Sequence, residues 1–367
     1  MKNFLFILGT RPEAIKLAPV IMEARRRGIH CQVVSTGQHG QIVQEMLAIF
    51  GLEVNVDLQV LAYNETHTQS LVTRIMEDLE YSYNLGEFTP PDLCFVQGDT
   101  TSTLVGALWS FYRNIPIAYI ESGLRSGAKR SPFPEEMHRR LIAQIADYHF
   151  CPTEESCENL MREGIRSNLF VVGNTVIDAM YMVLDRDYSF KPELQELVDS
   201  KNELIIMTIH RRENWFIAEE MFKAVRKYIE GLESIKLVIP THMNSMGELA
   251  KEVFKDSKNV LLVDPLPYDE FVNLTARSLF IVTDSGGIQE EAPYLMKPVL
   301  VVRRSTERTE ALRAGVSDII GVNPATIVNE IRSLLFDDLR YYNMVDINYH
   351  KYGAGDSARK IINVLRR

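Results

Sequence analysis

Near the start of the chain, residues 4–8 read FLFIL and residues 9–13 read GTRPE. Five consecutive apolar residues that end at a glycine predict a short strand buried on both faces of a sheet. Gly9 permits a tight turn, and Pro12 suits the first position of a helix, which we expect over Glu13–Arg26. A buried strand, a turn and an amphipathic helix are typical of the repeating unit of an α/β fold.

The same alternation of short apolar runs and longer amphipathic stretches continues along the chain. The strands expected in the first half are Phe4–Leu8, Gln32–Ser35, Leu93–Gln97, Ile117–Glu121, His149–Pro152 and Leu169–Val172. The helices expected between them are Glu13–Arg26, Gln41–Phe50, Ser70–Tyr83, Ser102–Tyr112, Glu135–Ala146 and Glu154–Glu163. The strands expected in the second half are Leu204–Thr208, Lys236–Pro240, Val260–Val263, Leu279–Thr283 and Pro298–Val302. Apolar strands separated by helices predict parallel sheets covered on both faces.

The length of 367 residues favours two domains over one, because about 150 residues per domain is typical. We expect the fold class α/β, with two doubly wound domains that face each other across a cleft. The first would cover residues 1–172 and the second residues 173–355, with the polar segment 185–203 as a surface excursion. Residues 356–367 read as a final helix. Ligands of such sheets bind beyond the carboxyl ends of the strands, so residues that follow strands are the candidates for a site.

The charge and the cysteines limit the classes of function. Lys plus Arg number 40 and Asp plus Glu number 49, so the net charge is −9. An acidic chain lacks the broad basic face of a dedicated nucleic-acid binder, so an anion must be bound by a local cluster. The four cysteines form no CxxC pair, which argues against a zinc knuckle and favours reduced thiols in the cytoplasm. No stretch approaches the ~20 apolar residues of a membrane span, and no signal peptide is indicated.

Two turns after strands combine backbone N–H groups with cations or a carboxylate. After the first strand, Arg11 and Lys16 flank a helix start, where free N–H groups attract an anion. After Leu279–Thr283, the turn Ser285-Gly286-Gly287 opens a helix that carries Glu291, whose carboxylate can accept both hydroxyls of a ribose. Arg308 follows another strand and could reach the phosphates of a nucleotide bound at this turn. The alternative for each turn is a simple helix start with favourable charges.

Four titratable residues near strand ends could exchange protons with a substrate. Asp99 and Glu121 follow or end strands, Glu135 begins a helix, and His210 follows the strand Leu204–Thr208. Singly, Asp99 could be a helix N-cap and Glu135 a first-turn acid. The chain has no GxGxxG after its first strand and no GxxxxGK[ST], so neither a bound NAD nor an ATP-splitting site is supported.

Seven motifs occur in order over residues 9 to 315: GTRPEAIK, QGDTTST, ESGLR, PFPEE, HRREN, DSGGIQEEAP and TERTEALRAG. On these motifs, the chain resembles the non-hydrolysing UDP-N-acetylglucosamine 2-epimerases. The resemblance implies two Rossmann-like domains in the GT-B arrangement, with the C-terminal helix returning to the first. It also implies a homodimer, a UDP-sugar substrate in the cleft, and neither a metal nor a nicotinamide cofactor.

The resemblance also assigns roles to individual residues. Asp99, Glu121 and Glu135 match the acid–base carboxylates of the family, and His210 matches its essential histidine. The positions that match UDP contacts are Arg11, Lys16, Ser285, Gly286, Gly287, Glu291 and Arg308, and Phe271 matches a residue at the uracil. Several bacterial relatives bind a second UDP-GlcNAc as an activator, and the positions that match that pocket are Gln38, Gln41, Arg74, Glu136, Arg211 and His242. Leu266, Thr309 and Ser122 depart from the family's usual Gln, Pro and Ala.

The chemistry of the substrate limits the reaction path. The hydrogen on C2 of an N-acetylhexosamine is not next to a carbonyl, so direct deprotonation would leave an unstabilised carbanion. Loss of UDP from C1 together with the C2 proton would give 2-acetamidoglucal, and protonation from the opposite face would return the epimer, UDP-ManNAc. Such a path needs cations on the diphosphate and carboxylates around C2.

Three other functions share part of this pattern. A GT-B glycosyltransferase would share the fold and the UDP turn, but it needs no carboxylates around C2. An epimerase of a UDP-diacetamido-uronic acid would need an additional cation, for which Arg125, Lys129 and Arg130 are candidates. A non-catalytic UDP-sugar sensor would need no acid–base residues.

Overall fold

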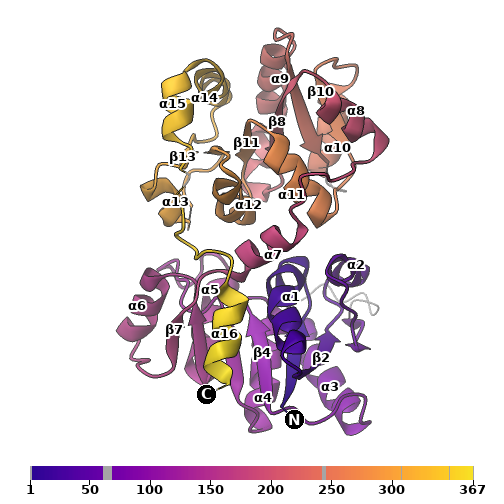
Figure 1. Cartoon of the computed structure of the whole chain (residues 1–367), viewed down its shortest axis with the longest axis vertical. Helices are drawn as coiled ribbons and strands as arrows, with labels where there is room; N and C mark the ends of the chain where they lie inside the picture. Colours follow the sequence, from indigo (N-terminus) through magenta and orange to yellow (C-terminus); the bar gives the residue numbers. More distant parts are fainter. Residues whose placement is uncertain (1, 61–67, 242–244, 307, 347, 367) are drawn as a thin grey trace. The chain divides into compact units, whose positions relative to one another are not determined.

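The computed structural model describes all residues except 1, 61–67, 242–244, 307, 347 and 367 (Figure 1). The chain forms two compact units. The first comprises Met1–Met182 and Tyr352–Arg367, and the second comprises Val183–Lys351. Each unit contains one parallel sheet with helices packed against it.

The sheet of the first unit has seven strands in the order β3-β2-β1-β4-β5-β6-β7. Their bounds are β1 Asn3–Leu8, β2 His30–Ser35, β3 Val56–Asp57, β4 Leu93–Gln97, β5 Ile117–Ile120, β6 Tyr148–Cys151 and β7 Leu169–Val171. All neighbouring strands are parallel, and β1 pairs with both β2 and β4. The order of the strands therefore reverses between β1 and β4, which is the point where ligands of doubly wound sheets bind.

Alternate side chains of β1 fill the two sides of this sheet. Leu5 and Ile7 share one buried cluster with Leu79 and Trp109, which come from two helices. Phe6, one position along, is stacked on Phe95 of β4, with ring centroids 4.6 Å apart. Because successive side chains of a strand point to opposite faces, an uninterrupted apolar run is needed to cover both sides.

The helices of the first unit are α1 Arg11–Arg26, α2 Gln41–Ile49, α3 Thr68–Asn84, α4 Thr101–Tyr112, α5 Glu135–Ile145, α6 Glu154–Arg162, α7 Thr175–Val183 and α16 Ser357–Leu365. The C-terminal helix α16 lies beside α1 (Figure 1). The Lys2 ammonium donates to the carbonyl oxygen of Leu365 at 2.5 Å, and Arg27 Nη1 donates to Asn363 Oδ1 at 2.6 Å. These contacts fix the end of the chain on the first unit.

The division between the units falls after Met182, just before the last residue of α7, and thus ten residues beyond the expected boundary at residue 172. The Asp178 carboxylate of α7 accepts hydrogen bonds from the backbone N–H groups of Ser357 and Ala358, at 3.2 and 2.9 Å. It thereby caps the start of α16, since a carboxylate is stabilising at a helix N-terminus. This link places α7 and the segment before α16 with the first sheet.

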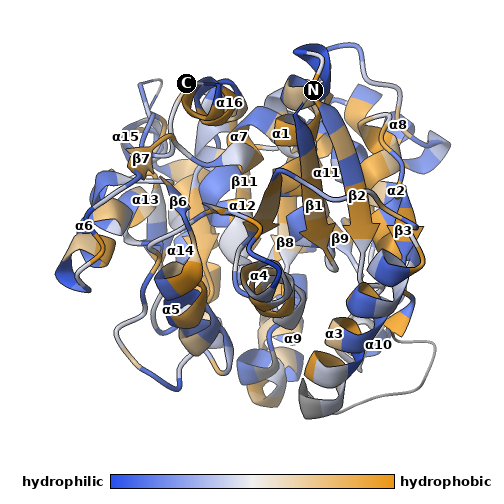
Figure 2. Ribbon diagram, turned by 90° about the horizontal axis from the view of Figure 1, so that it is seen from below, coloured by the Kyte–Doolittle hydropathy of each residue, from blue (hydrophilic) through white to orange (hydrophobic). Residues whose placement is uncertain are grey.

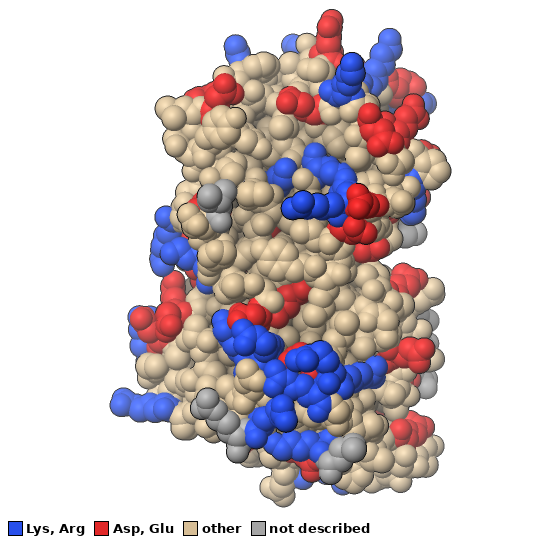
Figure 3. Space-filling model, viewed as in Figure 1, with Lys and Arg blue, Asp and Glu red and all other residues tan. Residues whose placement is uncertain are grey.

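Lys and Arg side chains gather over α1 and α16 on one face of the first unit (Figure 3). Part of this positive charge is paired locally. Glu23 contacts Arg26 and Arg27, and Asp356 contacts Arg359 and Lys360. The net charge of the chain therefore conceals a local cluster of cations.

The sheet of the second unit has six parallel strands in the order β10-β9-β8-β11-β12-β13. Their bounds are β8 Glu203–Thr208, β9 Ile235–Pro240, β10 Val260–Val263, β11 Phe280–Thr283, β12 Val299–Val301 and β13 Ser317–Ile319. Ile205 and Met207 of β8 belong to one buried cluster, and Leu204 and Ile206 belong to another on the other side of the sheet. The strand order reverses between β8 and β11, as it does between β1 and β4 in the first unit.

The α-helices of the second unit are α8 Pro192–Asp199, α9 Ala218–Ile229, α10 Ser245–Phe254, α11 Tyr268–Arg277, α12 Gly286–Glu291, α13 Thr309–Arg313, α14 Pro324–Phe336 and α15 Asp338–Asn343. Two 3₁₀ helices occupy Arg212–Ile217 and Ala292–Leu295. Figure 2 shows that the strands are largely hydrophobic, whereas hydrophilic residues gather on the outer faces of the helices. Among the described residues, no helix combines the length and the apolar character needed to cross a membrane.

All eleven expected strands are present, with ends that differ from the predicted ones by at most two residues. Two strands were not predicted: β3, which has two residues, and β13, whose three residues are Ser-Asp-Ile. Neither contains an apolar run. The polar segment 185–203 holds the helix α8, which buries Leu194, so it is not only a surface excursion.

Candidate active site

At the first strand-order reversal, the carboxyl group of Glu13 joins the loops after β1 and β4. Its Oε2 accepts hydrogen bonds from the backbone N–H groups of Gly9 and Thr10, at 2.6 and 2.8 Å. Its Oε1 accepts from the hydroxyls of Thr100 and of Thr103, the latter at 2.7 Å. Glu13 is buried, with 1% of its surface exposed.

The backbone N–H groups of the loop before α1 are therefore not free to bind an anion. The N–H groups of Gly9 and Thr10 are occupied by Glu13, and the N–H of Arg11 donates to His39 Nδ1 at 3.3 Å. The sequence carried a signal for this arrangement, since Thr10 and Glu13 have the spacing of a capping box. Arg11 remains at the first position of α1.

Glu121 lies directly after β5 with a left-handed backbone, φ 65°. A non-glycine residue in this region stores strain, which is common at functional sites. Its Oε2 accepts from the Lys16 ammonium at 2.6 Å and also from the Gln97 amide. Both Glu121 and Lys16 are buried. The structure thus joins a predicted acid–base residue to a predicted diphosphate contact as an ion pair.

Asp99 follows β4 and is held by α5. Arg139 contacts Asp99 Oδ2 through Nε at 2.8 Å and through Nη2 at 2.5 Å. His138 Nδ1 lies 2.8 Å from the carbonyl oxygen of Asp99. Two nitrogen atoms of a guanidinium orient a carboxylate strongly. Sequence reasoning missed Arg139 and His138, because neither lies next to a strand end.

Glu135 and Glu136 begin α5 but have different surroundings. Glu135 Oε2 is buried and has no hydrogen-bond partner in the described part of the chain. Glu136 is fully buried and accepts from Ser126 N at 2.9 Å, from Arg139 at 3.3 Å and from Arg140 at 3.2 Å. Glu135 thus presents an unoccupied acceptor, whereas Glu136 secures the loop before α5 and the Arg139 that holds Asp99.

The strand-order reversal of the second unit is built around Asp284, which is fully buried. Its Oδ1 lies 2.9 Å from His210 Nδ1. Its Oδ2 accepts from the N–H of Arg211 and from the Asn214 amide, both at 2.9 Å. Burial by itself would raise the pKa of Asp284, but His210 and these donors together lower it below its ordinary value. Asp284 therefore stays ionised and orients the predicted histidine, a role that sequence reasoning missed.

The glycine turn after β11 is packed against Arg308. Ser285 has an extended backbone before α12, which begins at Gly286. A Cβ on Gly286 would lie 3.4 Å from Cζ of Arg308, so the guanidinium rests against the turn. Arg308 Nε also donates to Glu290 Oε1 at 3.0 Å. The structure thus brings the turn and its predicted cation together.

Glu291, at the end of α12, accepts a hydrogen bond from the Tyr268 hydroxyl of α11. Its Oε2 lies 4.0 Å from where a Cβ on Gly287 would be. Phe271, one turn along α11, is half-buried against the apolar cluster that contains Leu266 and Ile206. The predicted ribose carboxylate and the predicted uracil contact therefore come from packed, adjacent elements.

A model of the UDP-N-acetylglucosamine 2-epimerase family matches residues 22–366. The chain belongs to this family. Membership confirms the resemblance seen in the motifs and makes the chain an epimerase enzyme. Among curated relatives, the UDP-N-acetylglucosamine 2-epimerase of Bacillus subtilis is 39% identical over 366 residues, covering 98% of this chain and 93% of the relative. That of Escherichia coli K12 is 39% identical over 372 residues, covering 99% and 98%.

Solved structures of the family have the same fold. S. aureus MnaA, in a co-structure with UDP, has a TM-score of 0.90 and 37% identity, covering 100% of this chain and 96% of that chain. The epimerase of Neisseria meningitidis bound to UDP-GlcNAc has a TM-score of 0.89 and 35% identity, covering 100% of both chains. The calicheamicin glycosyltransferase CalG4 shares the fold alone, with a TM-score of 0.62 and 15% identity. The predicted α/β class with two Rossmann-like domains is confirmed.

The described residues predicted to bind an activator have partners within the protein. The helix α2 begins at Gln41, and Gln38 precedes it. Gln38 Oε1 accepts from the Ser102 hydroxyl at 2.7 Å. Arg74 pairs with Asp78 at 3.2 Å along α3. Arg211 Nε donates to the carbonyl oxygen of Asp284 at 2.8 Å, and His242 lies outside the described residues.

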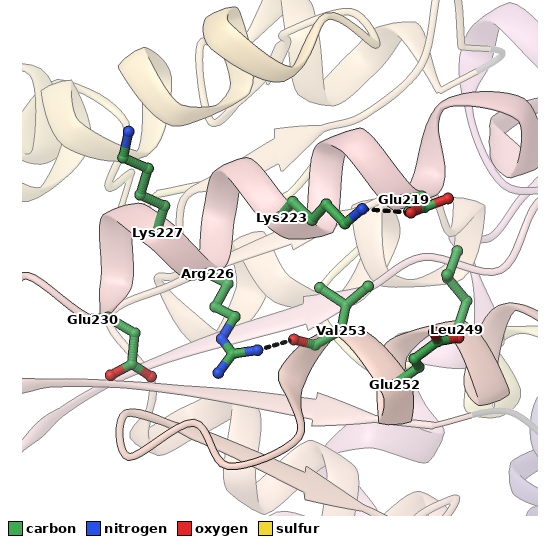
Figure 4. A pocket seen from close by; sticks show the side chains of 8 residues that line it. All are labelled: Glu219, Lys223, Arg226, Lys227, Glu230, Leu249, Glu252 and Val253. Atoms are coloured by element: carbon green, nitrogen blue, oxygen red, sulfur yellow. Dashed lines mark hydrogen bonds and ion pairs between the residues drawn. The ribbon is translucent and has the colours of Figure 1, made fainter.

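A surface hollow of about 400 Å³ lies between α9 and α10 (Figure 4). None of the predicted site residues lines it. Its lining has three cations and three carboxylates, and Lys223 pairs with Glu219 at 2.5 Å while Arg226 donates to the Val253 carbonyl oxygen at 2.5 Å. These charges balance one another, so the hollow shows no preference for an anionic ligand. No group of three or more His, Cys, Asp or Glu residues that could hold a metal occurs among the residues described.

Proposed function

We propose that this enzyme interconverts UDP-GlcNAc and UDP-ManNAc by eliminating UDP and adding it back. One observation carries the proposal: the first unit places three carboxylates, Asp99 after β4, Glu121 after β5 and Glu135 at the start of α5. Each of the three has different hydrogen-bond and ion-pair partners. The structures of relatives with UDP and with UDP-GlcNAc support a UDP-sugar as the substrate.

The elimination conserves atoms and electrons without a redox cofactor. A carboxylate takes the proton from C2, the C2–H electron pair forms the C1–C2 double bond, and the C1–O bond breaks with its pair on the diphosphate. The products are UDP and 2-acetamidoglucal. Protonation of C2 from the opposite face, with attack of the diphosphate oxygen on C1, gives the epimer. Each positioned acid or base could contribute on the order of 10²–10⁴ in rate.

The settings of the three carboxylates suit different roles. Glu135 Oε2, buried and without a partner among the described residues, suits a proton acceptor at C2. Glu121 is paired with Lys16. If Glu121 accepts a proton, the ammonium of Lys16 is released to contact the diphosphate. Asp99 is held by the guanidinium of Arg139, which fixes its orientation and makes it an electrostatic element of the site.

The second unit would hold the nucleotide and the departing charge. We propose that Glu291 binds the ribose, that Phe271 packs at the uracil, and that Arg308 and the turn Ser285-Gly286-Gly287 hold the diphosphate. Arg11 and Lys16 would add positive charge at the leaving diphosphate. His210, oriented by Asp284, would donate a hydrogen bond or a proton to the diphosphate as it leaves.

We propose UDP-GlcNAc, and not a UDP-diacetamido-uronic acid, as the substrate, and the pairing of Arg125 supports this. The additional carboxylate of a uronic acid needs a cation, and Arg125 was the nearest candidate to Glu121 in sequence. Arg125 instead donates to both oxygens of Glu163, from Nε at 2.8 Å and from Nη2 at 2.7 Å. Its guanidinium is thus committed to a carboxylate of the protein.

Proton NMR of the purified enzyme with UDP-GlcNAc in D₂O tests the reaction directly. The proposal requires UDP-ManNAc to appear with deuterium at C2, because the departing proton exchanges with solvent before the return step. UDP-ManNAc that retains the original hydrogen at C2 would contradict deprotonation by a solvent-exchanging carboxylate. Transfer of the sugar to an added acceptor without epimerisation would instead indicate a glycosyltransferase.

We propose that the enzyme is a homodimer that buries an apolar face of α3 and α4. Tyr81 and Leu85 of α3 are 66% and 58% exposed, and Phe111 and Tyr112 of α4 are 51% and 74% exposed. These two helices pack against each other, and exposed apolar side chains on neighbouring helices are of the kind that an interface can bury. Light scattering of the wild type and of Phe111→Glu tests this: the variant is expected to be monomeric. A monomeric wild type would contradict the proposal.

We also propose that a second UDP-GlcNAc activates the enzyme through Gln38, Gln41, Arg74, Glu136, Arg211 and His242. An activator shifts an equilibrium only by its differential affinity for two states, so UDP-GlcNAc should show sigmoidal kinetics. UDP-ManNAc alone should turn over poorly until a trace of UDP-GlcNAc is added. Gln41→Ala should weaken this activation while UDP binding persists. Hyperbolic kinetics and conversion of pure UDP-ManNAc without a lag would contradict the activator site.

We further propose that the enzyme works in the cytoplasm, where thiols stay reduced. All four cysteines are buried and free.

A further inference from the structure

The carboxyl group of Glu13 sits among donors that carry no charge. They are two backbone N–H groups on one oxygen and two threonine hydroxyls on the other. An ionised carboxylate with 1% of its surface exposed and no cation among these partners would pay a large desolvation penalty. Lys16, one turn along α1, pairs with Glu121 instead.

A count of protons shows which form of Glu13 fits. The hydroxyl of Thr103 lies 2.7 Å from Glu13 Oε1 and 2.8 Å from the carbonyl oxygen of Gln97. That carbonyl has no proton to give, and a hydroxyl has only one. The Thr103 proton can serve the Gln97 carbonyl or an ionised Glu13, but not both.

An additional proton on Glu13 Oε1 supplies the hydrogen bond for which the Thr103 hydroxyl has no second proton. Oε1–H would donate to the Thr103 hydroxyl, which would donate in turn to the Gln97 carbonyl oxygen. The other oxygen, Oε2, would remain a pure acceptor for the N–H groups of Gly9 and Thr10. Each oxygen then has the bonding that a neutral carboxylic acid requires. Burial also raises the pKa of Glu13, and its hydrogen bonds only partly oppose that shift.

We propose that Glu13 is held as a neutral carboxylic acid and that, in this form, it is a positioning residue for the active site. Its two oxygens bridge the loop after β1, which leads to Arg11, and the loop after β4, in which Thr100 is next to Asp99. The strands β1 and β4 are neighbours in the sheet, so one side chain spans both loops. The consequence for turnover rests on the function proposed above, whereas the protonation state does not.

Substitution of Glu13 by glutamine separates the neutral form from the charged form. The amide is a close mimic of the neutral acid: its oxygen can accept from Gly9 and Thr10, and its NH₂ can donate to the hydroxyls of Thr100 and Thr103. Glu13→Gln is therefore expected to keep turnover close to that of the wild type. Glu13→Ala removes the bridge and is expected to lower kcat on the order of 10²-fold, the scale of a displaced catalytic group. UDP affinity should fall much less than kcat in Glu13→Ala, because the proposed contacts of the second unit with the nucleotide do not depend on Glu13.

Difference infrared spectroscopy of the wild type and Glu13→Gln at neutral pH reads the protonation state without any substrate. The carbonyl stretch of a protonated carboxylic acid should be present in the wild type and lost in the variant. Glu23→Gln, on the same helix, is the matched control, because pairing with Arg26 and Arg27 lowers the pKa of Glu23 and keeps it ionised. That substitution should remove only a carboxylate band.

Three results would overturn the proposal: no protonated-acid band assignable to Glu13, a Glu13→Gln enzyme as impaired as Glu13→Ala, or a Glu13→Ala enzyme with normal kcat. The infrared measurement stands even where Glu13→Ala does not fold. It also stands if no UDP-ManNAc is formed, so failure of this proposal is distinguishable from failure of the proposed reaction.

Discussion

Replacement of Asp284 by asparagine should impair both stability and turnover, for reasons that follow from the contacts of its two carboxylate oxygens. Oδ2 accepts from the N–H groups of Arg211 and His210 and from the Asn214 amide, at 2.9, 3.1 and 2.9 Å. Oδ1 lies 2.9 Å from His210 Nδ1. An asparagine offers one acceptor oxygen and one donor NH₂. The oxygen will favour the site with three donors, which turns the NH₂ toward His210.

The variant should therefore lose one charge-assisted hydrogen bond and force His210 Nδ1 to accept instead of donate. The first effect should lower the free energy of unfolding by about 1.5–3 kcal/mol. The second places the histidine proton on the wrong nitrogen for its proposed role, which should lower kcat by a factor on the order of 10²–10⁴. Urea unfolding and steady-state kinetics measure the two effects separately.

The stability difference should also depend on pH with a defined sign. Because the pKa of Asp284 is lowered in the folded protein, its carboxylate stabilises the fold above the unfolded pKa of about 3.9. That contribution is lost as the pH falls through the folded pKa. The free energy of unfolding of the wild type should therefore exceed that of Asp284→Asn by a constant amount near neutral pH. This difference should shrink below about pH 4.

Asp318→Asn is the matched control within the same unit. Asp318 pairs with Arg340 at 3.0 Å, and 46% of its side chain is exposed. Surface pairs of this kind contribute about 0–1 kcal/mol, so this variant should unfold and turn over almost as the wild type does. If Asp284→Asn behaved like this control in both assays, Asp284 would not be the group that orients His210.

The remaining predictions concern the substrate groups. Glu291→Ala should weaken UDP binding by about 1–3 kcal/mol, and unchanged affinity in calorimetry would remove this carboxylate from the site. Asp99→Asn and Glu121→Gln should lose most epimerisation while remaining folded by circular dichroism, and near-normal turnover in either would refute its assignment. Free UDP and 2-acetamidoglucal should accumulate slowly during turnover of the wild type, detectable by chromatography, and their complete absence would argue against a released intermediate.

Much of the fold could be predicted because each long strand is a continuous apolar run between two amphipathic stretches. The run at residues 4–8 needs both its alternating sets of side chains, since Leu5 and Phe6 fill opposite sides of the sheet. β3 and β13 could not be predicted, because two or three residues with a polar member form no such run. Their place is determined by the neighbouring strand, β2 or β12, with which each one pairs.

The candidate site was predictable where it lies at strand ends and was missed where it depends on packing. Asp99 and His210 follow strands, so their position could be inferred from the order of elements. Arg139 acts on Asp99 from a helix 40 residues away, and no local pattern reveals that contact. Asp284 was visible only as part of a glycine-rich motif, because its role depends on the proximity of β8 and β11.

Each unit has one buried carboxyl group at its strand-order reversal, and the pKa values of the two groups are shifted in opposite directions. At each reversal of strand order, one buried carboxyl group accepts from two backbone N–H groups and ties the loops that follow the two central strands. The remaining partners of Glu13 are threonine hydroxyls, so burial dominates and its pKa rises. The remaining partners of Asp284 are a histidine and an amide, and together with the two N–H groups they outweigh burial, so its pKa falls. Similar loops can thus hold Glu13 as a neutral acid near Asp99 and Asp284 as an ionised partner of His210, because the donors around each carboxyl group determine its charge.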